Sequence, residues 1–197
     1  MARFVRLSVV LAVLCGTFAT MLNVVGVRVA LVAEESKTPK VGDEAKEFML
    51  TAIDGEKVKL SEQLKAGPVV LIVLRGFPGY QCPVCSAQVG HFISSATSFQ
   101  KKNTRILLIY PGPADGLKKH ATEFVRGKTL PKNVSLVLDP DYEFTKSYKL
   151  RWDAPNETAY PSTFVVAADG TIRFEKVSKT HSGRATVQEV LKALETL

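Results

Sequence analysis

Cysteine and histidine are both scarce in this chain, with three residues of each among 197. So few cysteines exclude a small scaffold stapled by disulfides. The three histidines, His91, His120 and His181, are single and scattered, whereas a zinc site needs paired ligands at metal spacing. The rest of the composition is ordinary, with 46% hydrophobic residues, which excludes disorder and collagen. We therefore expect one globular domain, with neither a metal nor another cofactor.

Long runs of basic residues are also absent, although the formal net charge is +7. Residues 1–33 hold three arginines and no acidic residue, so the remainder of the chain carries a net charge of +4. That charge is dispersed, and no basic run is longer than a pair such as Lys101-Lys102. Dispersed charge is typical of a solvated surface and not of a nucleic-acid interface. We expect no nucleic-acid partner.

The N-terminal segment holds a long hydrophobic run. Residues 1–6 are short and basic, and residues 7–27 are almost wholly apolar. Secretory signals have apolar cores of roughly 7–15 residues and spanning helices need about 20, so the length favours an anchor. Ala33, however, suits a signal-peptidase site. We predict a hydrophobic helix in residues 1–33, as a signal peptide or a membrane anchor, then a linker at 34–40. The body, 41–197, is then extracytoplasmic, periplasmic or secreted, and an uncleaved anchor would hold it at the membrane.

Hydrophobic periodicity in residues 41–197 alternates between strand and helix. Residues 48–53 and 56–60 alternate about Asp54-Gly55, which predicts a hairpin, and Ser61 is placed to cap a short helix. The apolar, β-branched run 68–74 indicates a central strand covered on both faces. Further strands are predicted at 104–110, 134–138, 163–168 and 171–177, and helices at 82–101, 117–125, 143–148 and after Thr186. Thr186 and Glu189 have the spacing of a capping box at the start of the last helix. This order predicts an α/β fold with a central mixed sheet flanked by helices.

Two cysteines, Cys82 and Cys85, stand where the loop after the central strand enters a helix. The free N–H groups and the dipole at a helix start stabilise a thiolate there, the nucleophile of disulfide exchange and peroxide reduction. The two-residue spacing lets one sulfur reach the other, so an oxidised sulfur can be resolved as a reversible disulfide. A purely structural disulfide is disfavoured because it would close almost no loop.

Three segments resemble the AhpC/TSA group of peroxiredoxin-like proteins, within the thioredoxin superfamily. They are VGDEAKEF at 41–48, GPVVLIVLRGFPGYQCPVCSAQ at 67–88 and YPSTFVV at 160–166. The resemblance runs from about residue 41 to the C-terminus and implies a thioredoxin-like fold. It also implies reduction of hydroperoxides, with recycling by a thiol donor such as a thioredoxin-like protein.

The resemblance leaves the attacking cysteine open. In the peroxiredoxin motif a proline is followed, after three residues, by Thr or Ser, and then, after two more residues, by the cysteine that attacks peroxide. In this chain the three positions are occupied by Pro78, Cys82 and Cys85. Cys85 would then attack and Cys82 would resolve the sulfenic acid to a disulfide. Thioredoxin-type dithiol proteins suggest the opposite assignment, with Cys82 as the attacking thiolate.

The chain departs from the peroxiredoxin pattern in one position. In the family, an arginine that polarises the peroxide stands three residues before an aromatic residue of a strand. Phe164 matches that aromatic residue, and this chain has Pro161 in place of the arginine. Pro161 fits the cis-proline of thioredoxin-like proteins, whose backbone binds substrate, or a plain strand-entry proline. Arg75 is a candidate for the missing cation, or a surface ion-pair partner. Tyr80 is a candidate wall of the site, or ordinary packing.

These residues favour a thiol peroxidase that acts on hydroperoxides through Cys82 and Cys85, with Arg75, Pro78, Tyr80 and Pro161 as substrate-binding candidates. The alternative is a thiol-disulfide oxidoreductase acting on exported proteins, which Pro161 would favour. A binding module with unused cysteines is a third hypothesis. The partners expected are a hydroperoxide, a thiol reductant, and a membrane through the N-terminal segment.

Overall fold

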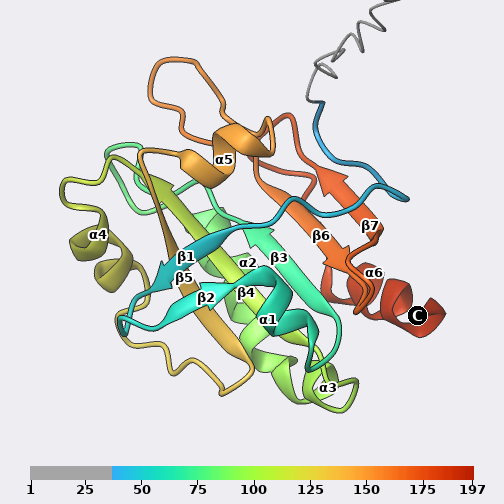
Figure 1. The fold of residues 1–197 in the computed structure, drawn as a ribbon. Coiled ribbons are helices and arrows are strands. Elements are labelled where there is room, and N and C mark those ends of the chain that lie inside the picture. Colours follow the sequence, from blue (N-terminus) through green and yellow to red (C-terminus); the bar gives the residue numbers. More distant parts are fainter. Residues whose placement is uncertain (1–36) are drawn as a thin grey trace, which may run out of the picture. The chain divides into compact units, whose positions relative to one another are not determined.

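The computed structural model describes residues 37–197 (Figure 1). Seven strands form one sheet in the order β2-β1-β5-β4-β3-β6-β7. They are β1 (Met49–Ala52), β2 (Lys57–Lys59), β3 (Val69–Val73), β4 (Arg105–Gly112), β5 (Val134–Pro140), β6 (Ser162–Val166) and β7 (Ile172–Val177). The helices are α1 (Leu60–Leu64), α2 (Pro83–Ser94), α3 (Ala96–Gln100), α4 (Leu117–Phe124), α5 (Glu143–Ser147), α6 (Val187–Ala193) and the 3-10 turn η1 (Leu194–Thr196).

The predicted hydrophobic helix of residues 1–33 lies outside the described residues, as does most of the predicted linker. Within residues 37–197, none of the helices has the length and hydrophobicity required to cross a bilayer.

The sheet is mixed, as the sequence predicts. Strands β3, β4 and β5 run parallel, with Val69 opposite Arg105 and Ile106 opposite Val134. Strands β1 and β6 are antiparallel to their neighbours β5 and β3. The predicted central strand is β3, whose five residues are all fully buried. Helices cover both faces of the sheet, which gives the predicted three-layer α/β architecture (Figure 1).

Alternate side chains of β3 belong to two separate cores. Val70 and Ile72 point to one face, where they join apolar residues of α2, α3, α4 and α6. Val69, Leu71 and Val73 point to the other face, where Leu60 of α1 and Phe144 of α5 complete the core. Because successive side chains of a strand point to opposite faces, one continuous apolar run serves both layers.

Two local predictions are wrong. The single helix predicted at 82–101 is interrupted at Ser95, which has φ −99° and ψ 5°. Just before the break, the Ser94 hydroxyl donates to the Gly90 carbonyl at 2.9 Å, a contact that bends helices. Helix α1 begins at Leu60 without a side-chain cap. The Ser61 backbone N–H there donates to the Glu47 carboxylate at 3.2 Å.

The capping box predicted after Thr186 is confirmed. The Thr186 hydroxyl accepts from the Glu189 N–H at 3.2 Å, and the Glu189 carboxylate accepts from the Thr186 N–H at 2.8 Å. These two hydrogen bonds fix the point at which the loop between β7 and α6 ends and the helix begins.

Leu71 tests the central position of β3. Leu71→Ala should lower the free energy of unfolding by about 2–5 kcal/mol, because the side chain is fully buried and leaves a cavity. The measurement is urea denaturation followed by circular dichroism. Met49→Ala, at a residue 63% exposed, is the matched control and should cost less than about 0.5 kcal/mol. Equal effects at the two positions would contradict the assignment of β3 to the core.

Candidate active site

The loop from β3 to α2 is pressed against the end of β4. Gly76 in this loop has φ +67°, a left-handed conformation that favours glycine. A Cβ at Gly76 would overlap the carbonyl oxygen of Pro111 in β4. Both the backbone angle and the close approach therefore require glycine, and they direct the chain toward the start of α2.

Cys82 caps the N-terminus of α2, and Pro83 follows at the first helical position. The Cys82 backbone is extended, and its Sγ accepts from the Cys85 N–H at 3.3 Å. A serine or threonine hydroxyl commonly takes this capping role. The Sγ of Cys85 accepts in turn from the Arg75 N–H at 3.4 Å. Both cysteines are free thiols at a helix start, in the location predicted for them.

The two thiols differ in acidity. The pKa of Cys82 is lowered to about 5, chiefly because the Cys85 thiol donates to its sulfur. Burial acts in the opposite direction and raises this pKa. The Cys85 N–H and the charges of Arg184 and Arg75 lower it further. Donation to Cys82 and burial raise the pKa of Cys85. The pKa of Cys82 is therefore the lower of the two, so Cys82 is the first of the pair to form a thiolate.

Cys82 also lines a cavity, whereas Cys85 does not. The cavity has a volume of about 510 Å³ and lies between the start of α2 and the end of α4. Ser86 of α2 and Glu123, Phe124 and Lys128 on the α4 side form part of its wall. Each cysteine residue is at most 2% exposed, so Cys82 meets solvent over only a small part of its surface.

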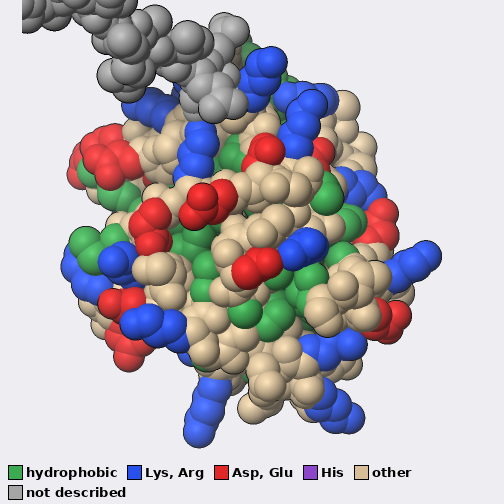
Figure 2. Space-filling model, turned by 45° about the vertical axis from the view of Figure 1, so that its right-hand side comes forward, with side chains coloured by type: hydrophobic (Ala, Val, Ile, Leu, Met, Phe, Trp, Pro, Cys, Tyr) green, Lys and Arg blue, Asp and Glu red, His purple; other side chains and the backbone are tan. Residues whose placement is uncertain are grey.

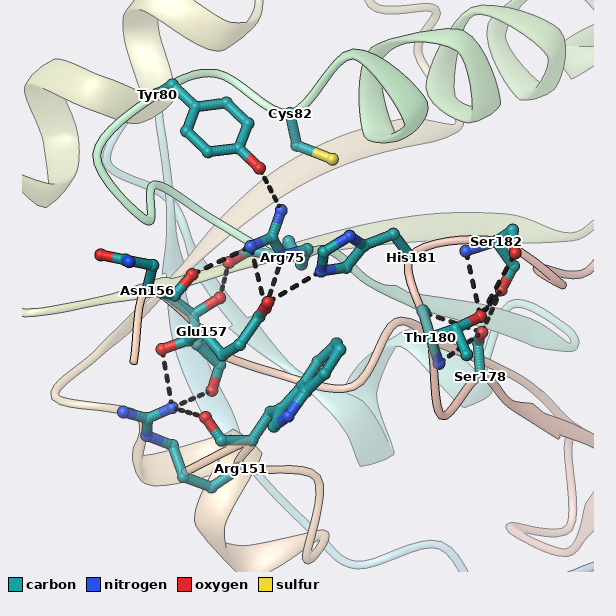
Figure 3. Close-up of polar contacts among 12 residues, drawn as sticks. Arg75, Tyr80, Cys82, Arg151, Asn156, Glu157, Ser178, Thr180, His181 and Ser182 are labelled. Atoms are coloured by element: carbon teal, nitrogen blue, oxygen red, sulfur yellow. Dashed lines mark hydrogen bonds and ion pairs between the residues drawn. The ribbon is translucent and has the colours of Figure 1, made fainter. Parts of the chain in front are cut away.

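Arg75 lies beside the pair as a buried ion-pair partner, not a surface one. Its side chain is 3% exposed, and it donates to the Glu157 carboxylate from Nε at 2.9 Å and from Nη2 at 2.8 Å. Nη1 donates to the Tyr80 hydroxyl at 2.8 Å. The second carboxylate oxygen of Glu157 contacts His181 at 2.8 Å (Figure 3). The charge of Arg75 is therefore compensated by Glu157, and its fork fixes the loop that carries Tyr80.

Tyr80 and Pro78 belong to the same loop. Tyr80 is 49% exposed and lies close to Cys82, with its hydroxyl turned toward Arg75 (Figure 3). Pro78 is half-buried, four residues before Cys82. The neighbouring Gln81 accepts from the Tyr110 hydroxyl at 3.0 Å and donates to the His120 carbonyl at 2.9 Å. These contacts tie the end of the loop to β4 and to α4.

A second arginine, Arg184, approaches the sulfur from the loop between β7 and α6. Its Nη2 lies 3.8 Å from Cys82 Sγ, and its Nη1 donates to Gln88 Oε1 at 3.1 Å. The sequence gives no signal for this contact, because Arg184 lies 102 residues from Cys82 in a polar loop. Glu157 was likewise not predicted.

A family model described as AhpC/TSA family matches residues 41–175, more than half of the chain. The chain belongs to the AhpC/TSA family. The resemblance noted in the sequence is therefore confirmed, and the protein is an oxidoreductase, a peroxiredoxin-like thiol peroxidase.

Individual relatives of this AhpC/TSA protein are peroxiredoxins. A putative peroxiredoxin bcp from Helicobacter pylori is 26% identical over 160 residues, covering 79% of this chain and 97% of that protein. Among solved structures, peroxidoxin BcpB from Mycobacterium tuberculosis superposes with a TM-score of 0.64 at 21% identity, covering 81% of this chain and 98% of that one. The mitochondrial 2-Cys peroxiredoxin of Plasmodium falciparum superposes with a TM-score of 0.62 at 24% identity, covering 80% of this chain and 93% of that one. The two structures share the thioredoxin-like fold.

Pro161 replaces the arginine of the AhpC/TSA pattern, and of the two alternatives left open for it the structure has the strand-entry proline and not the cis-proline, since no peptide bond in residues 37–197 is cis. It is buried directly before β6, and its carbonyl accepts from the Ser178 N–H at 2.8 Å. The preceding Tyr160 donates its N–H to the Leu150 carbonyl at 2.8 Å and accepts from the Ser162 hydroxyl at 2.8 Å. The backbone groups on both sides of the Tyr160–Pro161 bond thus have partners inside the protein.

The acidity of Cys82 in this AhpC/TSA site predicts a thiolate that persists in mildly acid solution. Its folded pKa is depressed to about 5, so the thiolate is present above that pH and is lost as pH falls through it. Thiolate absorbance at 240 nm of the reduced protein should therefore decrease with a midpoint near pH 5. Cys82→Ser should abolish this step. A midpoint near the ordinary value of about 8.5 would contradict the assignment.

Proposed function

We propose that this protein reduces hydroperoxides through a catalytic pair in which Cys82 attacks and Cys85 resolves. One observation carries the proposal: Cys82 Sγ, at a helix start, accepts a hydrogen bond from the Cys85 N–H, and the Cys82 residue forms part of the wall of an open cavity. Membership of the AhpC/TSA family supports peroxide as the substrate. The occupied backbone beside Pro161 gives no comparable support to protein-disulfide exchange.

The first step oxidises Cys82. Its thiolate attacks one oxygen of the hydroperoxide, so that an S–O bond forms while the O–O bond breaks. The sulfur loses two electrons and becomes a sulfenic acid, and the other oxygen leaves as an alkoxide or hydroxide that takes up a proton from solvent. The products are a cysteine sulfenic acid and an alcohol, or water when the substrate is hydrogen peroxide.

The second step uses Cys85, which is hydrogen-bonded to Cys82 within the first turn of α2. The Cys85 sulfur attacks the sulfenic sulfur, an S–S bond forms and water leaves. An external dithiol, such as that of a thioredoxin-like protein, then reduces the disulfide and becomes oxidised itself. The cycle consumes one hydroperoxide and one dithiol and forms one alcohol, one water and one disulfide.

The assignment of Cys82 as nucleophile differs from the family spacing, in which Cys85 occupies the attacking position. Three observations favour Cys82: its depressed pKa, its place in the cavity wall and the charge of Arg184 beside it. Cys85, by contrast, has a raised pKa and is not among the residues that line this cavity. A protonated, buried thiol next to the nucleophile suits the resolving role.

The location proposed for this activity is extracytoplasmic. Its support is the basic and then apolar sequence of residues 1–33, which is typical of a signal peptide or an anchor. An oxidising compartment would favour a reversible disulfide between Cys82 and Cys85.

Single substitutions test both the activity and the roles. The reduced full chain should consume hydrogen peroxide or cumene hydroperoxide about 10²-fold faster, or more, than free cysteine in stopped-flow measurements. Cys82→Ser should lose this reaction. Cys85→Ser should retain the first oxidation and accumulate a sulfenic acid that dimedone traps, because no resolving thiol remains. Cys15→Ser, the same change in the N-terminal segment, is the control and should leave the rate unchanged.

Two results would contradict the proposal in different ways. If Cys82→Ser still forms the sulfenic acid and Cys85→Ser does not, the nucleophile is Cys85. If the wild-type rate with hydroperoxide equals that of free cysteine while insulin disulfides are reduced efficiently, the protein is a thiol-disulfide oxidoreductase.

A further inference from the structure

Two arginines lie near the cysteine pair, and they differ in how their charge is compensated. Arg75 shares two hydrogen bonds with the Glu157 carboxylate. Arg184 has only neutral acceptors besides the sulfur, the Gln88 amide oxygen and the His181 carbonyl. Among residues 37–197, no carboxylate lies within ion-pair distance of Arg184. The positive charge of Arg184 is thus the one that remains available to a neighbouring anion.

The same two arginines differ in their contact with the sulfurs. Arg75 reaches Cys85 only through its backbone N–H, while its guanidinium is engaged by Glu157, Tyr80 and the Asn156 carbonyl. The guanidinium of Arg184 contacts Cys82 Sγ itself, at 3.8 Å. Arg184 is therefore placed to act on the reacting atom directly.

Gln88 fixes the direction of the Arg184 side chain. Gln88 is 8% exposed, and its Nε2 donates to the Ala185 carbonyl at 3.3 Å. This bond orients the amide so that Oε1 faces Arg184 and accepts from Nη1. Since Gln88 lies in α2, as does Cys85, the helix that presents the sulfurs also holds the cation beside them.

We infer that Arg184 is a catalytic residue of this site, supplying the cation that peroxiredoxins take from the position occupied here by Pro161, and that Gln88 is its positioning residue. This inference rests on the proposed function. During attack, negative charge moves from Cys82 Sγ to the leaving oxygen of the hydroperoxide. A guanidinium within reach of the sulfur stabilises both the thiolate before attack and the charge that develops on the leaving oxygen.

The test uses three substitutions in the full chain. Arg184→Gln removes the charge, Arg184→Lys keeps a charge without the planar fork, and Gln88→Met removes the acceptor at similar volume. Arg173→Gln is the matched control, because Arg173 of β7 pairs with Asp169 of the preceding turn at 2.8 Å and the change in net charge is the same. Melting temperatures establish that each variant is folded.

Two readouts are expected to move together. Arg184→Gln should raise the midpoint of the 240 nm thiolate titration by about one pH unit and slow single-turnover oxidation by hydrogen peroxide by about 10–10²-fold. Arg184→Lys should have a titration midpoint close to that of wild type, but its rate of oxidation by hydrogen peroxide should lie between those of Arg184→Gln and wild type. Gln88→Met should change the titration midpoint and the oxidation rate less than Arg184→Gln does. The double variant should differ little from Arg184→Gln alone in either measurement, because the two residues act through one contact. Arg173→Gln should resemble wild type in both readouts.

The two proposals fail in distinguishable ways. A wild-type protein without fast peroxide oxidation contradicts the proposed function, whereas the thiolate titration still reports on Arg184. A wild-type midpoint and rate in folded Arg184→Gln would overturn the assignment of Arg184. A shifted midpoint with an unchanged peroxide rate would also overturn it, since Arg184 would then affect acidity without acting in the reaction.

Discussion

Two backbone N–H groups hold the sulfurs of this site, and the rest of the site depends on them. The Cys85 N–H donates to Cys82 Sγ, and the Arg75 N–H donates to Cys85 Sγ. The first group belongs to the start of α2 and the second to the loop that directly follows β3, so both sulfurs are fixed between the central strand and its helix. Strand β3 is packed between two cores, which makes this junction a rigid platform for the thiols. On the face of the molecule drawn in Figure 2, acidic and basic side chains are interspersed.

Burial and sharing of one proton then make the two thiols unequal. Burial alone disfavours a thiolate at either position. The Cys85 thiol offsets that cost for Cys82 by donating to it, and in doing so becomes harder to ionise itself. One thiolate and one neighbouring thiol result, which is the protonation state that attack followed by resolution requires. The same geometry would not serve two independent thiolates, because their charges would repel at hydrogen-bond distance.

The sequence predicted the parts of the fold that local patterns encode. The apolar run of β3, the helical spacing of α2 and the Thr186 capping box each depend on neighbouring residues, and each was predictable. The cysteine pair was predictable for the same reason. Arg184 and Glu157 were not, because their contacts join residues 102 and 82 positions apart and depend on how the loops fold over the sheet. The state of the bond before Pro161 and the helix break at Ser95 also depend on tertiary contacts that no local pattern records.

The division of labour between the two arginines follows from their partners. A guanidinium paired with a carboxylate in a buried site mainly fixes the groups that it binds. Its electrostatic field on other groups is weak, because the two opposite charges largely cancel at a distance. Arg75 is of this kind: it joins the loop of Tyr80 to the loop of Glu157, and its charge lowers the pKa of Cys82 less than that of Arg184 does. Arg184, oriented by an amide and a carbonyl, keeps its full charge beside Cys82. A cation that reaches the sulfur from the loop after β7 can therefore replace one at the position directly before β6, provided that a neutral residue such as Gln88 orients it.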